Sequence, residues 1–347
     1  MTTTKHLDTP TRDHHLDIYR GCAMIYIVSI IHTLTASIGL DWYTHHHATL
    51  LLFVMPVIFY ISGAAYTLSP KKSYSQYLCG RIRRIFTPLI AYIAIYLTYS
   101  LIAGHITLRQ LPHTALRLCI EIATGKPTQL THLWFIHTYI IIALLLPILH
   151  HLSLRINHIA AYLLLIASMI VSYLYPNYII GYLIPTFAGL YYKRNKPYHP
   201  LVIITLMVAA TLLCLHQGYT WNMQVNKFPP NLLYIAYTTT ILLLLSKPLT
   251  WLCRHIARIP IIQCLITQYA THGYTIYLYH IHIIALIATA YHWLAQSLSA
   301  QLPFLATSWC AAPAISIATL LAMATVGKAT EYIRTYITRI TTAMQGK

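Results

Sequence analysis

Apolar stretches long enough to cross a membrane recur along the 347-residue chain and restrict its fold more than any other feature. A helix needs about 20 residues to span the roughly 30 Å hydrocarbon core of a bilayer. In lipid, each segment must also satisfy its own backbone hydrogen bonds, which favours helices. The expected spans are 19–39, 48–68, 83–104, 132–150, 157–175, 177–192, 200–216, 231–246, 270–294 and 306–327. The sequence therefore predicts an all-α, polytopic membrane helix bundle with about ten transmembrane helices.

Charged residues are scarce and unevenly placed. They make up 8% of the chain, whereas soluble domains carry roughly 25%. A formal net charge of +17 can suit a nucleic-acid-binding protein, but here the basic residues lie in short loops between apolar runs. With a cytoplasmic N-terminus, every Lys and Arg falls on the cytoplasmic side except Arg109, Arg117, Lys126 and Lys227. We therefore expect both termini in the cytoplasm, membrane lipids as partners and no nucleic acid.

The chain is expected to form a single membrane domain over residues 1–347. Residues 1–18 are assigned to a cytoplasmic N-terminal segment and residues 328–347 to a cytoplasmic C-terminal segment. The residues before the first apolar run are mostly polar, so that run is expected to be a retained signal anchor. Segment 247–260 alternates basic and apolar residues, which predicts an interfacial helix on the cytoplasmic face. The tail after Gly327 is expected to form another.

The first apolar run contains ionisable residues, which are costly in hydrocarbon and mark functional sites. Asp17 and Arg20 are one helical turn apart and can touch. His32 lies twelve residues beyond Arg20, about 18 Å along a helix axis, which places its imidazole near mid-membrane. Because histidine titrates near neutrality, it can act there as a general base. The alternative is that His32 only bonds two helices together and that Arg20 marks the inner membrane edge.

The second and third apolar runs carry two further features. Ser62 and Gly63 are small residues of the kind that let two helix backbones approach closely. Arg81, Arg83 and Arg84 stand together at the cytoplasmic start of the third run. Guanidinium groups bind phosphate oxygens through paired hydrogen bonds, so this cluster can hold an anionic cofactor such as coenzyme A. It can equally orient the helix and bind lipid headgroups.

Aromatic residues and histidines mark two later runs. His132, Trp134 and His137 begin the fourth run from the outer side, where an indole and imidazoles can bind a sugar or form an interfacial aromatic belt. Tyr277 and His280 are three residues apart and share one helix face. The candidate substrate-binding residues are Ser62, Trp134, His137, Tyr277 and His280.

No metal site is expected. The seven cysteines form no CxxC pair and lie mostly in apolar surroundings, so they are interpreted as packing residues. His280 and His282 point to different sides of a helix and make a poor ligand pair. The three histidines at 45–47 lie near Asp41 in an outer loop, but without a second spaced ligand pair they are a weak signal for zinc.

Five short motifs occur in a defined order along the chain. They are LDIYRG followed by His32, IFYISG, RIRRIFTP, HLWFI and TIYLYH. In this order they resemble the acyltransferase 3 family of integral-membrane acyltransferases. Each motif alone is weak, but the ordered set covers most of the chain and is fairly specific.

The resemblance implies an enzyme of the bacterial inner membrane that transfers an acyl group, commonly acetyl from cytoplasmic acetyl-CoA, to a hydroxyl of a glycan or lipid-linked glycan. The catalytic pair it implies is Arg20 and His32, and we expect Asp17 to act with Arg20 in orienting His32. The coenzyme A contacts it implies are Arg81, Arg83 and Arg84. His280 corresponds to the histidine of the last motif, and no metal is implied.

The spacing of Arg20 and His32 exceeds the family pattern by one residue. In a regular α-helix, twelve steps of about 100° leave the two side chains about 120° apart, so they would not share a face. A π-bulge absorbs one residue and restores the alignment, and such bulges favour functional sites. We therefore predict a π-bulge between Gly21 and Ile31.

A secondary transporter or exporter is the alternative from a different class. Multiple spans, a proline-interrupted helix at Pro185 and membrane histidines able to relay protons would also suit transport. The ordered motifs and the arginine cluster favour the acyltransferase. An inverted repeat of the kind many transporters carry is not visible in the sequence.

Overall fold

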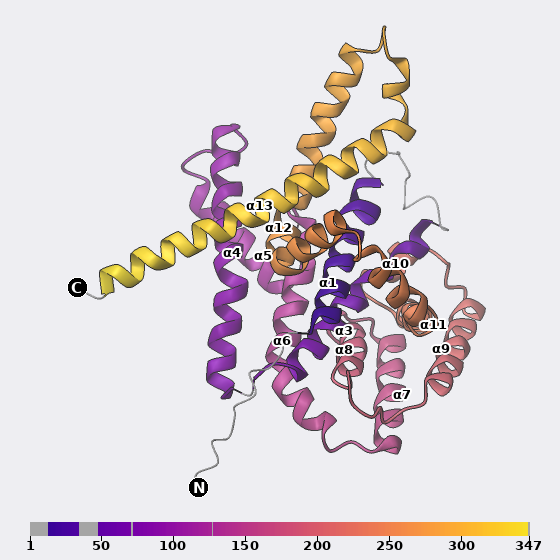
Figure 1. Ribbon diagram of the computed structural model, residues 1–347. Helices are drawn as coiled ribbons and strands as arrows, with labels where there is room; N and C mark the ends of the chain where they lie inside the picture. The colour runs from indigo at the N-terminus through magenta and orange to yellow at the C-terminus, as the bar shows by residue number, and fades with distance from the viewer. Residues whose placement is uncertain (1–12, 35–47, 71, 127, 346–347) are drawn as a thin grey trace.

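The structure is a computed structural model that describes residues 13–34, 48–70, 72–126 and 128–345 (Figure 1). The described residues are mostly helical and contain no β-strand, only an isolated bridge between Lys227 and Pro230. The α-helices are α1 (His14–Tyr26), α3 (Val54–Thr67), α4 (Tyr74–Ile102), α5 (Leu111–Thr124), α6 (Trp134–Ser153), α7 (His158–Leu174), α8 (Tyr178–Gly189), α9 (Pro200–His216), α10 (Met223–Asn226), α11 (Leu232–Ile256), α12 (Pro260–Ser297) and α13 (Ser308–Gln345). The other helical elements are η1 (Ile27–Leu34), η2 (Ala48–Leu51), η3 (Thr131–Leu133) and η4 (Pro303–Ala306). The predicted all-α fold is therefore confirmed.

Six helical segments of the described chain are long and apolar enough to cross a bilayer, judged by length and composition. They are Ala48–Thr67, Tyr74–Ile102, Thr131–Ser153, Leu232–Ile256, Pro260–Ser297 and Trp309–Thr330. Helices α7, α8 and α9 are apolar but shorter, and they occupy three further expected spans. These helices support a polytopic membrane protein, whereas the count of ten spans and the cytoplasmic location of both termini stay predictions.

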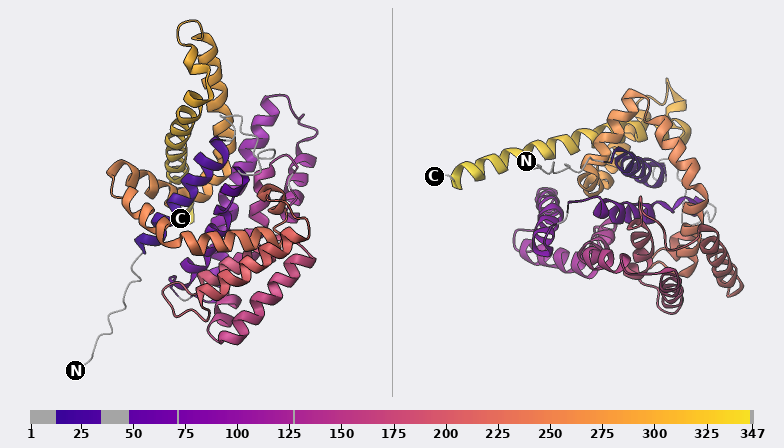
Figure 2. Two further views of the ribbon diagram at one scale, coloured as in Figure 1. Left: turned by 90° about the vertical axis from the view of Figure 1, so that its right-hand side faces the viewer. Right: turned by 60° about the horizontal axis from the view of Figure 1, so that its bottom comes forward.

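Helix α1 runs through the middle of the bundle and packs along α12 (Figure 1). Helices α12 and α13 form a long hairpin that rises beyond the other helices, and the C-terminal part of α13 extends away from the bundle in Figure 1 and in the right view of Figure 2. Helix α3 packs on α8, and α9 packs on α11. The central helices α1, α3 and α12 therefore define the interior in which a site can form.

Two predicted interfacial helices do not exist as separate elements. Segment 247–260 mostly continues α11, which ends at Ile256, and the tail after Gly327 continues α13. Pro248 lacks a backbone N–H but does not end α11. Beyond it, Trp251 and His255 are one turn apart and their ring centroids lie 4.1 Å from each other, which supports the added turns. In α11 and α13, the change from apolar to basic residues therefore marks where the apolar part ends, and the helix itself continues beyond it.

Two glycines allow helices near the centre to pack backbone to backbone. A Cβ atom on Gly21 of α1 would overlap the carbonyl of Ile266 in α12. One on Gly63 of α3 would overlap the carbonyl of Thr186 in α8. Such close approach requires a residue without a side chain. The interpretation of Gly63 as a packing residue is confirmed, and α1 is fixed against α12 in the same way.

The first helix changes from α to π hydrogen bonding at Ile27 and stays π-helical to Leu34. In this segment the Thr33 hydroxyl donates to the carbonyl of Val28, five residues earlier, at 2.6 Å. The predicted π-bulge is therefore confirmed, and it extends beyond the expected interval to include His32. Because a π-helix turns less per residue than an α-helix, the segment rotates His32 back toward the face that carries Arg20.

Candidate functional site

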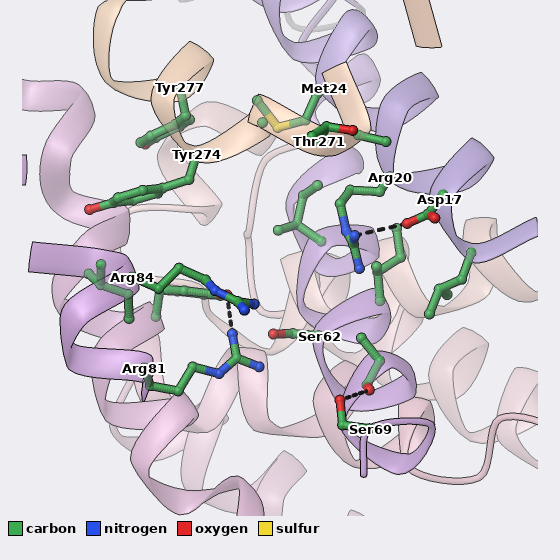
Figure 3. Close-up of a pocket in the computed structure, with 18 of the residues that line it drawn as sticks. Asp17, Arg20, Met24, Ser62, Ser69, Arg81, Arg84, Thr271, Tyr274 and Tyr277 are labelled. Carbon is green, nitrogen blue, oxygen red and sulfur yellow. Dashed lines mark hydrogen bonds and ion pairs between the residues drawn. The ribbon is translucent and has the colours of Figure 1, made fainter. Parts of the chain in front are cut away.

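A cavity of about 470 Å³ lies between α1, α3, α4, α6 and α12 (Figure 3). Its volume falls within the roughly 300–1,000 Å³ that small-molecule sites occupy. Exposed residues, among them Ser69 and Pro70, line one part of the cavity. Buried residues, among them Phe135 and Tyr277, line another. The cavity therefore extends from the molecular surface into the bundle.

Three arginines give the cavity a positive charge (Figure 3). Arg20 donates from Nη1 to Oδ1 of Asp17, 3.1 Å away. Arg81 donates from Nη1 to the hydroxyl oxygen of Tyr139 at 3.1 Å, and Arg84 reaches the cavity from the next turn of α4. Asp17 pairs with Arg20, and Asp13, the other carboxylate that lines the cavity, pairs with Lys193, so neither carboxylate pairs with Arg81 or Arg84. The arrangement is therefore suited to an anionic ligand such as a phosphate.

Asp13 fixes the start of α1 at the rim of the cavity. Its Oδ1 accepts hydrogen bonds from the backbone N–H groups of His15 and Leu16 at 3.0 and 3.2 Å, and its Oδ2 lies 2.5 Å from Nζ of Lys193. Burial raises the pKa of the Asp13 carboxyl, but Lys193 and the two N–H groups outweigh this effect and hold the pKa below its ordinary value. Asp13 therefore joins α1 as a charged cap to the segment between α8 and α9.

Tyr277 of α12 separates the cavity from a cluster of histidines. Its ring lines the cavity. The same ring lies 5.5 Å from the ring of His280 and 6.1 Å from that of His132, measured between centroids. Its hydroxyl donates to the backbone carbonyl of His132, which holds the ring in place. A ligand in the cavity and a ligand among the histidines would therefore approach each other at this tyrosine.

We call the group His32, His132, His280 and His282 the histidine cluster. The ring centroids of His32 and His280 lie 4.8 Å apart. His132 lies 5.9 Å from His280 and 6.1 Å from His282. The hydroxyl of Tyr92 lies 2.7 Å from Nε2 of His282 and joins the cluster to α4. The π-helical segment, α6 with its preceding turn, and α12 thus bring four imidazoles together inside the bundle.

His280 has a defined tautomer because of its hydrogen bond. Its side chain is fully buried, and Nδ1 lies 2.7 Å from the carbonyl of Tyr277. Since a carbonyl only accepts, Nδ1 must donate, and Nε2 of the neutral ring is then an acceptor. Nε2 has no hydrogen-bond partner among the described residues. A buried acceptor of this kind, beside His32, can receive a hydroxyl group of a ligand.

The structure brings together two sets of the predicted site residues. Asp17, Arg20, Ser62, Arg81, Arg84 and Tyr277 line the cavity. His32 and His280 lie behind Tyr277. Arg20 and His32 therefore belong to neighbouring parts of the site, the first in the cavity and the second in the histidine cluster.

Three other predicted residues lie elsewhere. Arg83 is exposed and does not line the cavity. Nδ1 of His137 lies 2.6 Å from the carbonyl of Ala123, so His137 joins α6 to α5. Trp134 lies among aromatic rings, 5.2 Å from that of Phe228. Histidines 45–47 and Asp41 fall outside the described residues, and in the described ranges no group of His, Cys, Asp or Glu could hold a metal ion.

Sequence reasoning missed Tyr139 and Tyr274, which line the cavity, and gave no individual role to His132. Helical periodicity contains a signal for two of them. Tyr274 precedes Tyr277 by three residues, and Tyr139 follows Phe135 by four, so each shares a helix face with another cavity residue. His132 meets α12 across a long sequence separation, and no local pattern indicates such a contact.

The apolar helices are those of a polytopic membrane protein, and its basic cavity is suited to an anionic ligand. The sequence matches the family model described as an acyltransferase domain over residues 13–327. The chain therefore belongs to the acyltransferase 3 family, as its motifs indicated, and its activity is that of an acyltransferase in general terms. Comparison with curated proteins and with solved structures gave no significant match.

Proposed function

We propose that the protein is a membrane O-acyltransferase. It transfers an acyl group, acetyl in the first instance, from cytoplasmic acyl-CoA to a hydroxyl of a glycan or lipid-linked glycan at the bacterial inner membrane. The observation that carries this proposal is the contact of Tyr277 with both the basic cavity and the histidine cluster. One part of the site suits an anionic donor, and the adjacent part suits the deprotonation of an acceptor.

The distribution of basic residues supports a cytoplasmic opening of the cavity. Asp13 at the rim pairs with Lys193, and Tyr19 on the same helix lies 3.5 Å from Nη2 of Arg254. Lys193 from the segment between α8 and α9 and Arg254 from the last turn of α11 thus gather at the start of α1. Because positive loops of membrane proteins are cytoplasmic, this end of the bundle is the one that cytoplasmic acyl-CoA would meet.

In the proposed reaction, His32 accepts the proton of the acceptor hydroxyl. The hydroxyl oxygen attacks the thioester carbonyl carbon, an ester bond forms, and the carbon–sulfur bond breaks. The sulfur leaves as a thiolate of coenzyme A, which then takes up a proton. Arg20, Arg81 and Arg84 would hold the phosphates in the cavity, and Nε2 of His280 would help to orient the acceptor hydroxyl.

The binding of acetyl-CoA to purified protein tests the donor side. Calorimetry on detergent-solubilised wild type should show saturable binding. The double variant Arg81→Ala with Arg84→Ala should bind at least about tenfold more weakly, because it loses two of three guanidiniums in the cavity.

Arg83→Ala is the matched control, since Arg83 lies on the same helix but outside the cavity. It should bind acetyl-CoA as the wild type does. Thermal unfolding of each variant checks that the fold is intact, because Arg81 also bonds to Tyr139. Absence of binding to folded wild type, or equal losses in both variants, would contradict the proposed donor site.

A further inference from the structure

The segment between α9 and α11 carries a lysine inside the protein. Lys227 has only 7% of its surface exposed, and Asn222, Asn226 and Asn231 in the same segment are also buried. The ion pairs among the described residues use the carboxylates of Asp13, Asp17 and Glu121, and none of them includes Lys227. Removing an ammonium group from water without a counter-charge is costly. Such a lysine is expected to have a ligand.

Hydrogen bonds hold the backbone around Lys227 in place. The Asn231 side chain donates to Oδ1 of Asn226 at 2.7 Å, and the Asn226 side chain donates to the carbonyl of Thr220 at 2.8 Å. The Met223 N–H donates to the Thr49 hydroxyl at 2.9 Å, which ties the segment to η2. The position of Lys227 is therefore preorganised, as a binding site requires.

Aromatic rings surround the ammonium group. Nζ of Lys227 lies 4.7 Å from the ring centroid of Phe228 and 5.5 Å from that of Trp134. The ring of Trp134 also packs against Tyr178 at 5.3 Å, and this face of α6 leads to Phe135 on the cavity wall. Aromatic faces bind both cations and the apolar faces of sugars. The lysine and the tryptophan together offer a charge and a stacking surface.

Lys227 is also close to the histidine cluster. Trp134, whose ring centroid lies 5.5 Å from Nζ of Lys227, follows His132 by only two residues. The charge of Lys227 also acts on His32. In the expected topology, the segment that carries Lys227 faces the outer side, opposite to the basic opening of the cavity. A ligand held by Lys227 would therefore meet His32 from the side opposite to the donor.

We propose that Lys227, with Trp134 and Phe228, forms a subsite that binds an anionic group of the acceptor, a carboxylate or a phosphate, and thereby places a neighbouring sugar hydroxyl at His32. This inference rests on the proposed function and adds a class of acceptor, an anionic sugar. Lys227 is here a positioning and specificity-determining residue. It takes no part in the proton transfer.

The first test identifies the charge of the labelled product. Membrane vesicles from cells that express the wild type are given radiolabelled acetyl-CoA, and the labelled glycans are separated by anion exchange. The label should be found in anionic glycans. Phosphatase treatment should shift the labelled glycans to the neutral fraction if the anion is a terminal phosphate, and carbodiimide-coupled reduction should do so if it is a carboxylate. Label confined to neutral glycans would overturn the inference.

The second test uses Lys227→Met, which removes the charge and keeps an apolar side chain of similar length. The KM for the anionic acceptor should rise about tenfold or more, while the binding of acetyl-CoA stays unchanged. Thermal stability should not fall, because an uncompensated buried charge is removed. A variant with wild-type KM, or one that loses stability and donor binding together, would show that Lys227 is only structural.

Lys227→Arg provides a rescue and a pH signature. Burial lowers the pKa of Lys227 to about 8, so the wild type should lose kcat/KM for the anionic acceptor as the pH rises through this value. His32 is the titratable group that faces Lys227, and it is the same in both proteins. Because arginine stays charged, the variant should keep its activity above pH 8. If the wild type binds acetyl-CoA but transfers no label to any glycan, the proposed acceptor reaction itself fails.

Discussion

At the scale of single residues, the proposed reaction depends most on His32, which is its general base. His32 lies in the π-helical segment, and its ring packs edge to face on that of His280. The ring of His280 in turn lies 5.5 Å from that of Tyr277. His280 offers a second acceptor nitrogen, but its Nδ1 is already bonded to the carbonyl of Tyr277. In the proposed reaction, the family motif assigns the role of the base to His32, and Nε2 of His280 orients the acceptor hydroxyl.

His32→Ala should lower acyl transfer by about 10²–10⁴-fold, the range that a general base contributes. The binding of acetyl-CoA should be unaffected, because His32 does not line the cavity. Incorporation of labelled acetyl groups into glycans measures the first effect, and calorimetry measures the second. A variant that keeps full transfer activity would exclude the role of His32 as the base.

Two substitutions of Asp13 can distinguish the effect of its helix cap from the effect of its ion pair on stability. Asp13→Asn keeps a good helix cap and loses the ion pair with Lys193, whereas Asp13→Ala loses both and should cost about 1 kcal/mol more. Because the pKa of Asp13 is lowered in the folded protein, its charge stabilises the fold above the ordinary pKa of 3.8 and ceases to do so as the pH falls below it.

Melting temperatures between pH 7 and pH 3 test this prediction. Lys193 is more than half exposed, so the difference between wild type and Asp13→Asn should be small at pH 7 and should shrink further as the pH falls below about 4. A difference that grows toward low pH would show that the carboxylate acts with the opposite sign.

Local motifs predicted residues that line the cavity. They did not predict contacts between residues that are far apart in the sequence. Arg20, Ser62 and Arg81 come from three separate motifs, and the structure places all three around one cavity. Lys227 was recognised only as one of the few basic residues outside the cytoplasmic loops. Its burial depends on contacts with Trp134 and with η2, far away in the sequence, and no spacing rule encodes these contacts.

At the scale of elements, the π-helical segment sets the orientation of His32 relative to Arg20. It absorbs the additional residue between Arg20 and His32, so the chain keeps the close packing of Gly21 on α12 and still delivers His32 to His280. The prediction of this bulge came from a spacing argument. Its length was not predictable, because hydrogen bonding beyond Ile31 depends on how α12 and α13 pack on it.

Deletion of Ser29 should convert part of the segment to α-helix and preserve the orientation of His32 relative to α1. We expect this variant to keep measurable acyl transfer. Insertion of one alanine at the same place should abolish transfer, since the helix would have to absorb a second residue. Labelled product per amount of protein in the membrane is the measurement. Equal losses of activity in both variants would argue against the π-helix as the device that sets the register.

The extent of α11 shows where reasoning from hydropathy fails. The expected span ends at residue 246, where the apolar run gives way to the alternating basic and apolar residues of segment 247–260. A proline removes one hydrogen bond, but the helix continues to Ile256. The sequence therefore predicted the apolar part of the element correctly and its full length incorrectly.

At the scale of the whole molecule, the open question is the orientation in the membrane. Three exposed cysteines are natural reporters, namely Cys79 on α4, Cys119 on α5 and Cys264 on α12. If the basic end of the bundle is cytoplasmic, Cys119 lies on the outer side, and the other two lie on the inner side.

Single-cysteine variants should therefore label in two classes with a membrane-impermeant maleimide. Cys119 should react in intact cells, whereas Cys79 and Cys264 should react only after the cells are permeabilised. Denatured protein serves as the control for thiol reactivity. The reverse pattern would invert the topology and place the basic cavity away from cytoplasmic acyl-CoA.

The position of Tyr277 has a consequence for which part of the donor would have to cross the membrane. An aromatic ring held by its own hydroxyl stands where the two halves of the site meet. In the proposed reaction, the coenzyme A part of the donor would stay on one side of this ring and the acceptor on the other, so only a small neutral acyl group would pass between them. The proposed reaction would then be vectorial, because the acyl group would cross the membrane while coenzyme A remains on the cytoplasmic side.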